Sequence, residues 1–362
     1  MKFMKHKNWI LAGTLAVSVA MATAGNEDRA GSAGSMDLLI NPWARSSGWF
    51  GANTAIGRGL ESQFLNVAGM AFTERTELIF SHTRWLAGTD IGINNFGFSQ
   101  NMGKKRGVIG LSVMSLGSGN IEETTVNSPE GTGNTYSVNN LNIAVSYARG
   151  FSDKIYGGIT VRIMTQSLTN VAATGFTIDA GIMYKTTIGK RELNKDNLHF
   201  GITLKNIGPR MMATGDGLTV YNISPINGAV MTQQQRSADF EVPALMNIGA
   251  AFIQRFTKKH AMTFAFNFTT HSFSRDQFIL GLEYNFNDML MLRGGYAFED
   301  GIFGERDGVN PDLLNAFTGP SGGLSFEAPF KKNKPTKIAL DYSYRATYNF
   351  AGVHTFGMRL LL

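Results

Sequence analysis

The chain has 362 residues, no cysteine and a formal charge of +6, with 42 glycines and 26 phenylalanines. The lack of cysteine excludes disulfides, thiolate catalysis and cysteine-based metal sites. The excess of positive charge is small and scattered, whereas nucleic-acid binding needs a basic stripe or a recognisable module, so we expect no nucleic-acid partner.

The first 24 residues predict a secretory signal peptide. Lys2, Lys5 and Lys7 precede an apolar run over residues 9–19, and Ala22-Thr23-Ala24 gives the small-x-small pattern of a cleavage site. Cleavage there removes three lysines and lowers the charge from +6 to +3. No later apolar run approaches the ~18 residues that a transmembrane helix requires. We therefore expect an exported protein whose mature chain starts at Gly25.

The next two segments do not look like strands. Residues 25–35 are small and polar, which predicts a flexible tether. Residues 36–73 contain Pro42, two tryptophans and five glycines without regular alternation. This composition predicts short helices and turns that enter the mouth of a barrel as an N-terminal plug, so residues 74–362 remain for the barrel itself.

From Thr76 onward, apolar and polar residues alternate in stretches of about 9–11 residues. Successive side chains of a strand point to opposite faces, so each stretch has one apolar and one polar face. After an export signal, this predicts an all-β fold, a transmembrane antiparallel β-barrel of about 14 strands in the outer membrane. The predicted strands start near Thr76, Asp90, Arg106, Asn139, Ile155, Thr174, Asn197, Met246, Met262, Gln277, Met289, Pro320, Lys337 and Gly352. The second is irregular at Asn94-Asn95, which predicts a bulge, and the twelfth is rich in glycine.

The predicted connections alternate in length. Those after the even-numbered strands are tight or moderate, and long ones fall on the third, seventh and eleventh positions, at residues 117–138, 208–245 and 299–319. Long loops on one side and short turns on the periplasmic side are typical of outer-membrane barrels. This parity predicts that both termini are periplasmic.

Charged residues on the predicted lumen side allow two interpretations. They line either a selective channel or substrate site, or a solvated and mutually paired interior, and polar-inward alternation alone already predicts the second. No histidine pair with metal-ligand spacing, no carboxylate cluster and no Gly-x-Ser-x-Gly elbow occurs. We therefore predict no catalytic residue, no metal, no cofactor and no enzymatic activity. The lumen-side charges are Arg162, Asp179, Lys205, Arg255, Glu283, Arg293, Asp341, Arg345 and Arg359.

The loop 208–245 is a candidate partner site. It holds Pro209, Met211, Met212 and Met231. Methionine side chains adapt to varied partners, and loops longer than ~15 residues are often functional. The alternative is an extracellular loop without regular structure, and the sequence does not decide between the two.

Two N-terminal motifs resemble the PorV/PorQ family of Bacteroidota, which is related to FadL-type fatty-acid channels. Residues 44–52 follow the family segment Ala-Arg-Ser-x-Gly-x-Gly-Gly-Ala, with Phe50 in place of one glycine. Residues 66–69 follow Asn-Pro-Ala-Gly, with Val67 in place of proline, and the last hairpin fits as well. The final Leu362 departs from the aromatic ending that is usual for outer-membrane barrels. The resemblance identifies as plug-motif residues Ala44, Arg45, Ser46, Gly48, Gly51, Asn66, Ala68 and Gly69.

The resemblance implies an outer-membrane component of the type IX secretion system. Its expected partners are the large translocon barrel, secreted proteins with C-terminal signal domains, and outer-membrane lipid. Its expected role is to bind the translocon or to shuttle cargo to the cell surface. The alternative is a FadL-like transporter of hydrophobic small molecules, with residues 36–73 as its hatch and a lateral gap at a bulged strand such as 90–100.

Overall fold

The computed structural model describes residues 25–362 except 104, 190–191, 300–314 and 331–335. The predicted signal peptide and most of the predicted loop 299–319 therefore lie outside the described residues. Within the described part of the chain, no helix is long and apolar enough to span a membrane.

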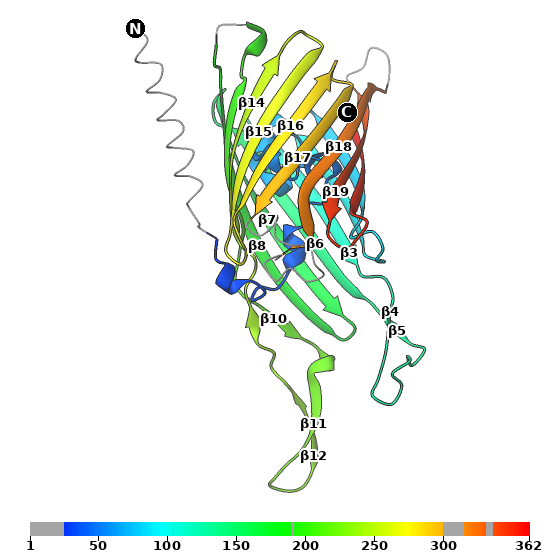
Figure 1. Ribbon diagram of the computed structural model, residues 1–362. Coiled ribbons are helices and arrows are strands. Elements are labelled where there is room, and N and C mark those ends of the chain that lie inside the picture. The colour runs from blue at the N-terminus through cyan, green and yellow to red at the C-terminus, as the bar shows by residue number, and fades with distance from the viewer. Residues whose placement is uncertain (1–24, 104, 190–191, 300–314, 331–335) are drawn as a thin grey trace, which may run out of the picture.

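Fourteen strands close into one antiparallel ring (Figure 1). The ring closes because the first of them pairs with the last as well as with the second, so neither has a free edge there. The ring strands are β1 (Thr76–Arg84), β2 (Gly92–Asn101), β3 (Val108–Gly117), β6 (Val138–Gly150), β7 (Ile155–Leu168), β8 (Val171–Thr186), β9 (Leu198–Ile207), β14 (Leu245–Arg255), β15 (His260–His271), β16 (Gln277–Phe286), β17 (Leu290–Glu299), β18 (Phe317–Pro329), β19 (Lys337–Thr347) and β20 (Val353–Leu361).

The prediction of a 14-stranded antiparallel barrel is confirmed, and no observed strand starts more than three residues from its predicted start. The predicted bulge at Asn94-Asn95 is wrong, since β2 pairs with both neighbours without a register shift. The shifts lie between Ile178 and Ala180 at β8–β9, and between Phe317 and Ser321 at β18–β19. Irregular alternation therefore marked the wrong strand.

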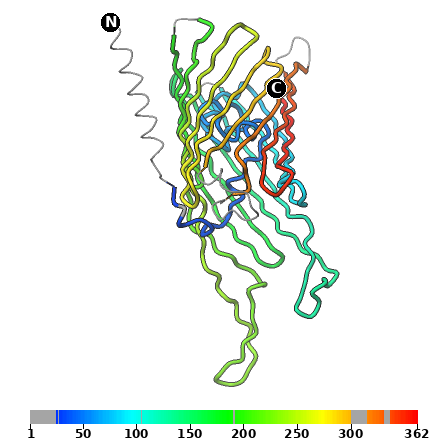
Figure 2. The backbone as a smooth tube through the Cα atoms, viewed as in Figure 1, coloured from blue at the N-terminus to red at the C-terminus, as the bar shows by residue number. Residues whose placement is uncertain are grey.

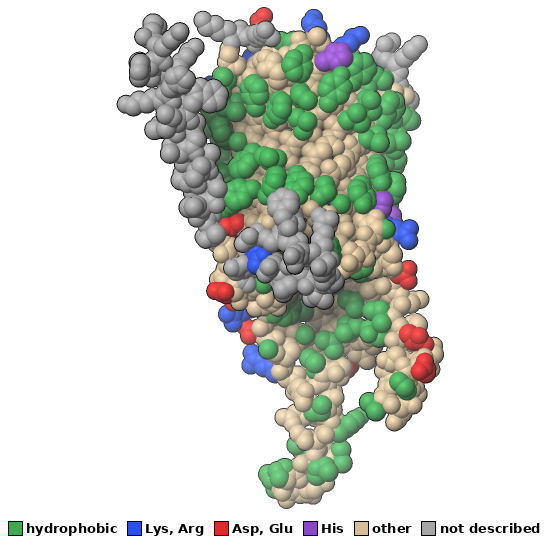
Figure 3. All heavy atoms as spheres, in the orientation of Figure 1, with side chains coloured by type: hydrophobic (Ala, Val, Ile, Leu, Met, Phe, Trp, Pro, Cys, Tyr) green, Lys and Arg blue, Asp and Glu red, His purple; other side chains and the backbone are tan. Residues whose placement is uncertain are grey.

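The outer and inner faces of the barrel wall carry different kinds of side chain. Outward positions carry large apolar groups, such as Ile182 at 61% and Leu340 at 56% exposed, whereas inward Ser81, Thr160 and Thr355 are at most 1% exposed. Apolar side chains cover the upper wall in Figure 3, with lysine, arginine and histidine gathered at its rim. This is the arrangement of a barrel whose outer surface faces lipid.

The long connections extend the tall side of the barrel, where β6, β7 and β8 have 13, 14 and 16 residues. The loop 208–245 is not irregular: β10 pairs with β8, and β13 pairs with β10. Beyond them, β11 and β12 form a projecting hairpin (Figure 1). The bounds in the connections are β4 (Ile121–Glu122), β5 (Thr135–Tyr136), η5 (Glu192–Asn194), β10 (Met211–Thr214), η6 (Asp216–Leu218), β11 (Thr219–Ile223), β12 (Val230–Gln234) and β13 (Asp239–Phe240).

Residues 36–73, here called the interior segment, lie inside the ring of strands (Figure 2). They form η2 (Met36–Leu39), α2 (Ala44–Ser47), η3 (Ala52–Ala55), α3 (Ser62–Leu65) and η4 (Val67–Phe72). Their apolar side chains meet inward apolar residues of the wall in three buried clusters. One joins Trp43, Leu60 and Met70 to Ile79 and Val108, and another packs Trp49 against small wall residues. The core of the protein is therefore the contact between this segment and the barrel.

Residues 25–35 are anchored at the rim that carries the long loops, in contrast to the predicted tether. They begin with η1 (Glu27–Arg29), and the Arg29 guanidinium pairs with Glu241 at 2.9 Å and lies 4.2 Å from the centroid of the Phe273 ring. The hydrogen bond from Arg29 holds the pKa of the Glu241 carboxyl below its ordinary value. Ala33 also forms a β-bridge with Glu241, so this stretch continues the edge of β13.

The described chain crosses the barrel from one rim to the other. The Asn26 amide donates to the carbonyl of His271, at the long-loop end of β15, over 3.3 Å. At the opposite rim, Asn101 Nδ2 donates to the Thr73 carbonyl over 2.8 Å, and Leu362 ends beside Thr76. The expectation that both termini share the short-turn side is therefore wrong for the start of the described chain. The number of strands does not reveal the position of the N-terminal end, because the interior segment before β1 crosses the barrel once more without forming a strand.

Cysteine labelling in whole cells tests this route, because the native chain has no cysteine. We expect Ala30→Cys, on the exposed N-terminal stretch, to react with a membrane-impermeant maleimide as readily as Ile226→Cys in the β11–β12 hairpin. Asp153→Cys, in a short turn, should react only after the outer membrane is permeabilised. Protection of Ala30→Cys together with Asp153→Cys would contradict the described path.

Candidate functional site

The first plug motif folds α2 against β18, β19 and β20. Ala44 is buried, and its Cβ lies 3.1 Å from the position that a Cβ on Gly357 would occupy. A Cβ on Gly48 would come within 3.0 Å of the Gly323 Cα and of the Arg293 side chain. Small residues on both sides therefore let the interior segment approach the wall backbone closely.

The departure from the motif at Phe50 has a structural consequence. Phe50 and Gly51 both adopt left-handed backbone, with φ of 53° and 85°. Glycine adopts this conformation without strain, which accounts for the paired glycines of the family motif, whereas a phenylalanine there is strained. The Phe50 ring packs edge-to-face on Phe317 of β18 with centroids 5.3 Å apart. The substitution thus adds an aromatic ring to the interior.

The second plug motif ties three parts of the molecule together through Asn66. Its Oδ1 accepts from the Ala68 amide as the cap of η4, and its Nδ2 donates to the carbonyls of Thr54 and of Ile182 in β8. A side chain at Gly69 would collide with the carbonyl of Gly57. Val67 occupies the first position of η4, where proline is well tolerated.

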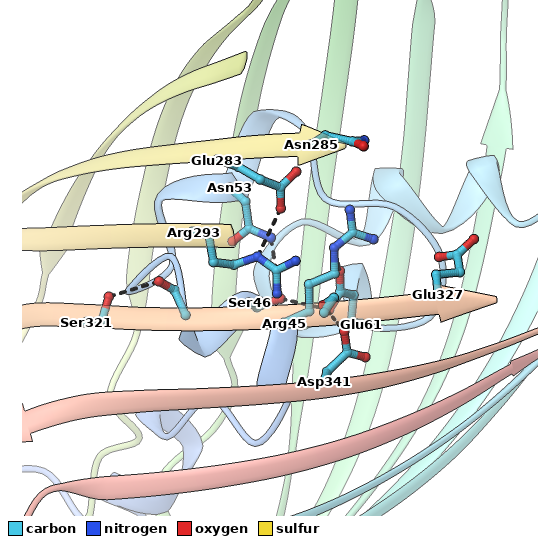
Figure 4. A network of polar contacts seen from close by, with 12 residues as sticks. Arg45, Ser46, Asn53, Glu61, Glu283, Asn285, Arg293, Ser321, Glu327 and Asp341 are labelled. Atoms are coloured by element: carbon cyan, nitrogen blue, oxygen red, sulfur yellow. Dashed lines mark hydrogen bonds and ion pairs between the residues drawn. The ribbon is translucent and has the colours of Figure 1, made fainter. Parts of the chain in front are cut away.

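A buried polar network joins the two halves of the interior segment (Figure 4). Ser46 Oγ donates to Glu61 at 3.3 Å, Arg45 Nε lies 3.7 Å from the same carboxylate, and Asn53 Nδ2 donates to Ser46 Oγ at 3.4 Å. The motif residues Arg45 and Ser46 thus satisfy a carboxylate that would otherwise be buried alone.

Six of the nine predicted lumen charges form three ion pairs between neighbouring strands. Arg162 lies 3.0 Å from Asp179, Arg293 lies 2.9 Å from Glu283, and Arg359 lies 2.7 Å from Asp341. The last two pairs face α2 and the Arg45–Glu61 contact (Figure 4). The paired arrangement agrees with the interpretation of these charges as a mutually neutralised interior.

The other three lumen charges have different surroundings. The Lys205 ammonium is buried and lies 3.6 Å from the centroid of the Phe64 ring in α3. Arg255 lies at the end of β14, where its backbone amide donates to Asn194 and its guanidinium donates to the Lys195 carbonyl. Arg345 is also buried, and like Lys205 it forms no ion pair with a carboxylate among the described residues.

Arg345 lies within an aromatic–arginine cluster formed with Phe50, Trp85 and Phe317. The guanidinium carbon is 5.4 Å from the Trp85 ring centroid and 4.9 Å from that of Phe317. Its Nε and Nη2 are buried and make no hydrogen bond. The three rings are only partly buried. The cluster therefore combines partly exposed aromatic surface with hydrogen-bond donors, a combination that pattern analysis of the sequence did not find.

The wall next to this cluster is irregular. Pairing of β17 with β18 ends at Tyr296 and Pro320, and β18 shifts register against β19 between Phe317 and Ser321. Proline has no amide hydrogen to donate, and Gly319 has a φ of 103°. Among the described residues, the hydrogen-bonded ladder is thus interrupted where Phe317 meets the interior segment.

The four residues of the predicted partner loop lie in different surroundings. Met211 is 1% exposed and packs in a buried cluster with Leu38 and Met164, so it is not available to a partner. Pro209 is exposed, Met212 is half-buried, and Met231 is 52% exposed in the β11–β12 hairpin. Among the described residues no group of histidines and carboxylates could hold a metal ion.

Comparison with solved structures finds barrels over nearly the whole chain. The Ralstonia pickettii toluene transporter TbuX matches with a TM-score of 0.54 and 14% identity, covering 89% of this chain and 98% of that one. The Pseudomonas putida toluene transporter TodX matches with a TM-score of 0.54 and 15% identity, covering 89% and 97%. The chain therefore has the barrel fold of these two structures. No protein-family model and no curated protein matches.

The Asn66 contacts predict how the interior segment is held. We expect Asn66→Ala to destabilise its docking by about 2 kcal/mol, because buried carbonyls and the Ala68 amide lose their partner. Hydrogen exchange should accelerate over residues 53–72 while the barrel strands remain protected. Asn222→Ala, which removes an exposed hydrogen bond in the β11–β12 hairpin, is the matched control. Unchanged exchange in the Asn66 variant would contradict this role.

Proposed function

We propose that the protein is an outer-membrane channel for hydrophobic small molecules. The observation that carries this proposal is the likeness in fold to two toluene transporters over 89% of the chain. The outward apolar surface and the predicted signal peptide support the location. The interior segment serves as the plug, because its buried contacts with the wall leave the lumen occupied.

The aromatic–arginine cluster is the proposed substrate contact. Phe50, Trp85 and Phe317 offer partly exposed rings at the end of the barrel that carries the long loops, next to the interrupted ladder of β17 and β18. A hydrophobic molecule that reached the cluster could leave sideways into the membrane there, without passing the charged contacts around Arg45 and Glu61. We therefore propose the interrupted ladder at β18, in place of the regularly paired residues 90–100, as the position of the lateral gap.

Uptake of labelled toluene by cells that express the protein tests this function. We expect uptake above that of cells without it, and a loss of about threefold to tenfold for Phe50→Gly, because an aromatic contact is removed. Glycine suits the left-handed backbone at this position, so the variant should fold. Phe80→Ala removes an outward ring from β1 and is the matched control. Equal uptake with and without the protein would refute the proposal.

A secretion role is the second candidate, and the β11–β12 hairpin is the observation that favours it. Tyr221, Ile223 and Ile226 are 81%, 70% and 93% exposed there, far from the outward wall. Exposed apolar groups on a projecting hairpin suit a protein partner. Together with the resemblance of the plug motifs to the PorV/PorQ family, this supports binding to a type IX translocon barrel or to its cargo.

Affinity purification in mild detergent tests the second candidate. We expect the native protein to recover a very large barrel together with proteins that carry C-terminal signal domains. The double variant Ile223→Ser and Ile226→Ser should lose them, because the apolar contact is removed, while it still inserts in the membrane. Val126→Ser, at an exposed position of the 117–138 loop, is the matched control and should retain the partners. Recovery of the protein alone would reject the secretion role.

A further inference from the structure

A second apolar site lies outside the barrel, on the wall made by β6, β7, β8 and β9. It is a groove of about 610 Å³. Its volume falls within the range of small-ligand pockets. Tyr147, Phe151, Ile159, Tyr184, Phe200 and Leu204 belong to its lining, together with residues that have small side chains or none.

The groove arises from two small residues on the outward face. Strand register places Gly157 between Arg149 and Ile182, and places Ala180 between Ile159 and Leu204. Their neighbours along the wall carry full side chains, so a depression forms at these two positions. The Phe151 ring lies over Gly157, 2.7 Å from where a Cβ would stand. Phe151 belongs to the turn between β6 and β7 and fills the space over Gly157, so the open part of the depression lies over Ala180.

One end of the groove has polar and cationic groups at the depth of the short turns. Tyr147 and Tyr184 face outward there, as tyrosines do at a membrane interface. Arg149 is exposed on the same face of β6, directly opposite Gly157, and has no ion-pair partner among the described residues. Lys154 lies in the adjoining turn and is also exposed. The site is therefore apolar along its length, and at its end Arg149 and Lys154 outnumber the one exposed carboxylate of the turn, Asp153.

We propose that this groove binds one phospholipid in the leaflet on the short-turn side. One acyl chain lies in the depression over Ala180, beside the Phe151 ring, and the phosphate lies against Arg149. A groove on a lipid-facing wall is filled either by an acyl chain or by another membrane protein. The cation at headgroup depth favours the lipid, because a guanidinium binds phosphate through charge-assisted hydrogen bonds. The inference concerns the outer wall and does not depend on what the interior transports.

Native mass spectrometry of the full-length protein, with phosphatidylglycerol added at known ratios, tests the site. We expect one lipid to be retained at activation energies that strip the rest. Ala180→Leu should abolish this retention by filling the depression. Arg149→Gln should weaken binding about fivefold, the contribution of one basic residue near a membrane surface.

Matched variants on the other side of the barrel make the test specific. Gly322→Leu points outward on β18, half-way round the ring, where its Cβ would have only the Arg293 carbonyl nearby at 3.8 Å. Arg84→Gln removes an exposed arginine at the opposite rim. Both should retain the lipid, and heat-dependent gel migration should show that every variant is folded. Equal retention by Ala180→Leu and the wild type would overturn the proposal, and so would equal loss in Gly322→Leu. Stoichiometric capture of a membrane protein at the groove in place of lipid would overturn it as well.

Discussion

Closure of the backbone hydrogen-bond ring is the constraint on which the rest of this structure depends. A strand edge exposed to hydrocarbon would leave amides and carbonyls without partners, at several kcal/mol each. The pairing of β1 with β20 removes that edge. Once the ring is closed, outward residues between the two rims meet lipid, and inward residues must find partners in the lumen. The alternation of the sequence follows directly from this division.

The lumen meets that demand in two ways. Charges on neighbouring strands neutralise each other, as in Arg359–Asp341 and Arg293–Glu283. Inward apolar residues of the wall pack against the interior segment, chiefly against Trp43, Trp49 and Leu60. Removal of one partner from such a buried pair costs more than the pair contributes, because the other charge is left unpaired. Each buried charge in the interior therefore depends on its partner being kept.

The strand pattern could be predicted well because alternation is a local signal that membrane lipid imposes on every strand. The two bulges could not be predicted, because a bulge depends on the partner strand. The register shift at Ile178 of β8 lies opposite Asn206 of β9, which has a φ of 59°. The burial of Met211 was likewise hidden, since it packs on Leu38 of the interior segment and on Met164 of β7, both distant in sequence. The aromatic–arginine cluster draws its members from four separate segments, and no spacing along the chain brings them together.

The passage of the interior segment through the barrel has a consequence for the order of assembly. The segment enters at one rim and leaves at the other to become β1, so it is threaded through a closed ring. The pairing of β1 with β20 joins the first and the last strand of the barrel in sequence. Closing so long a loop of chain has a high cost in conformational entropy. If the ring closed first, the segment would have to be drawn through a completed lumen. The sheet is therefore best formed around the segment, which then acts as a template that the wall encloses.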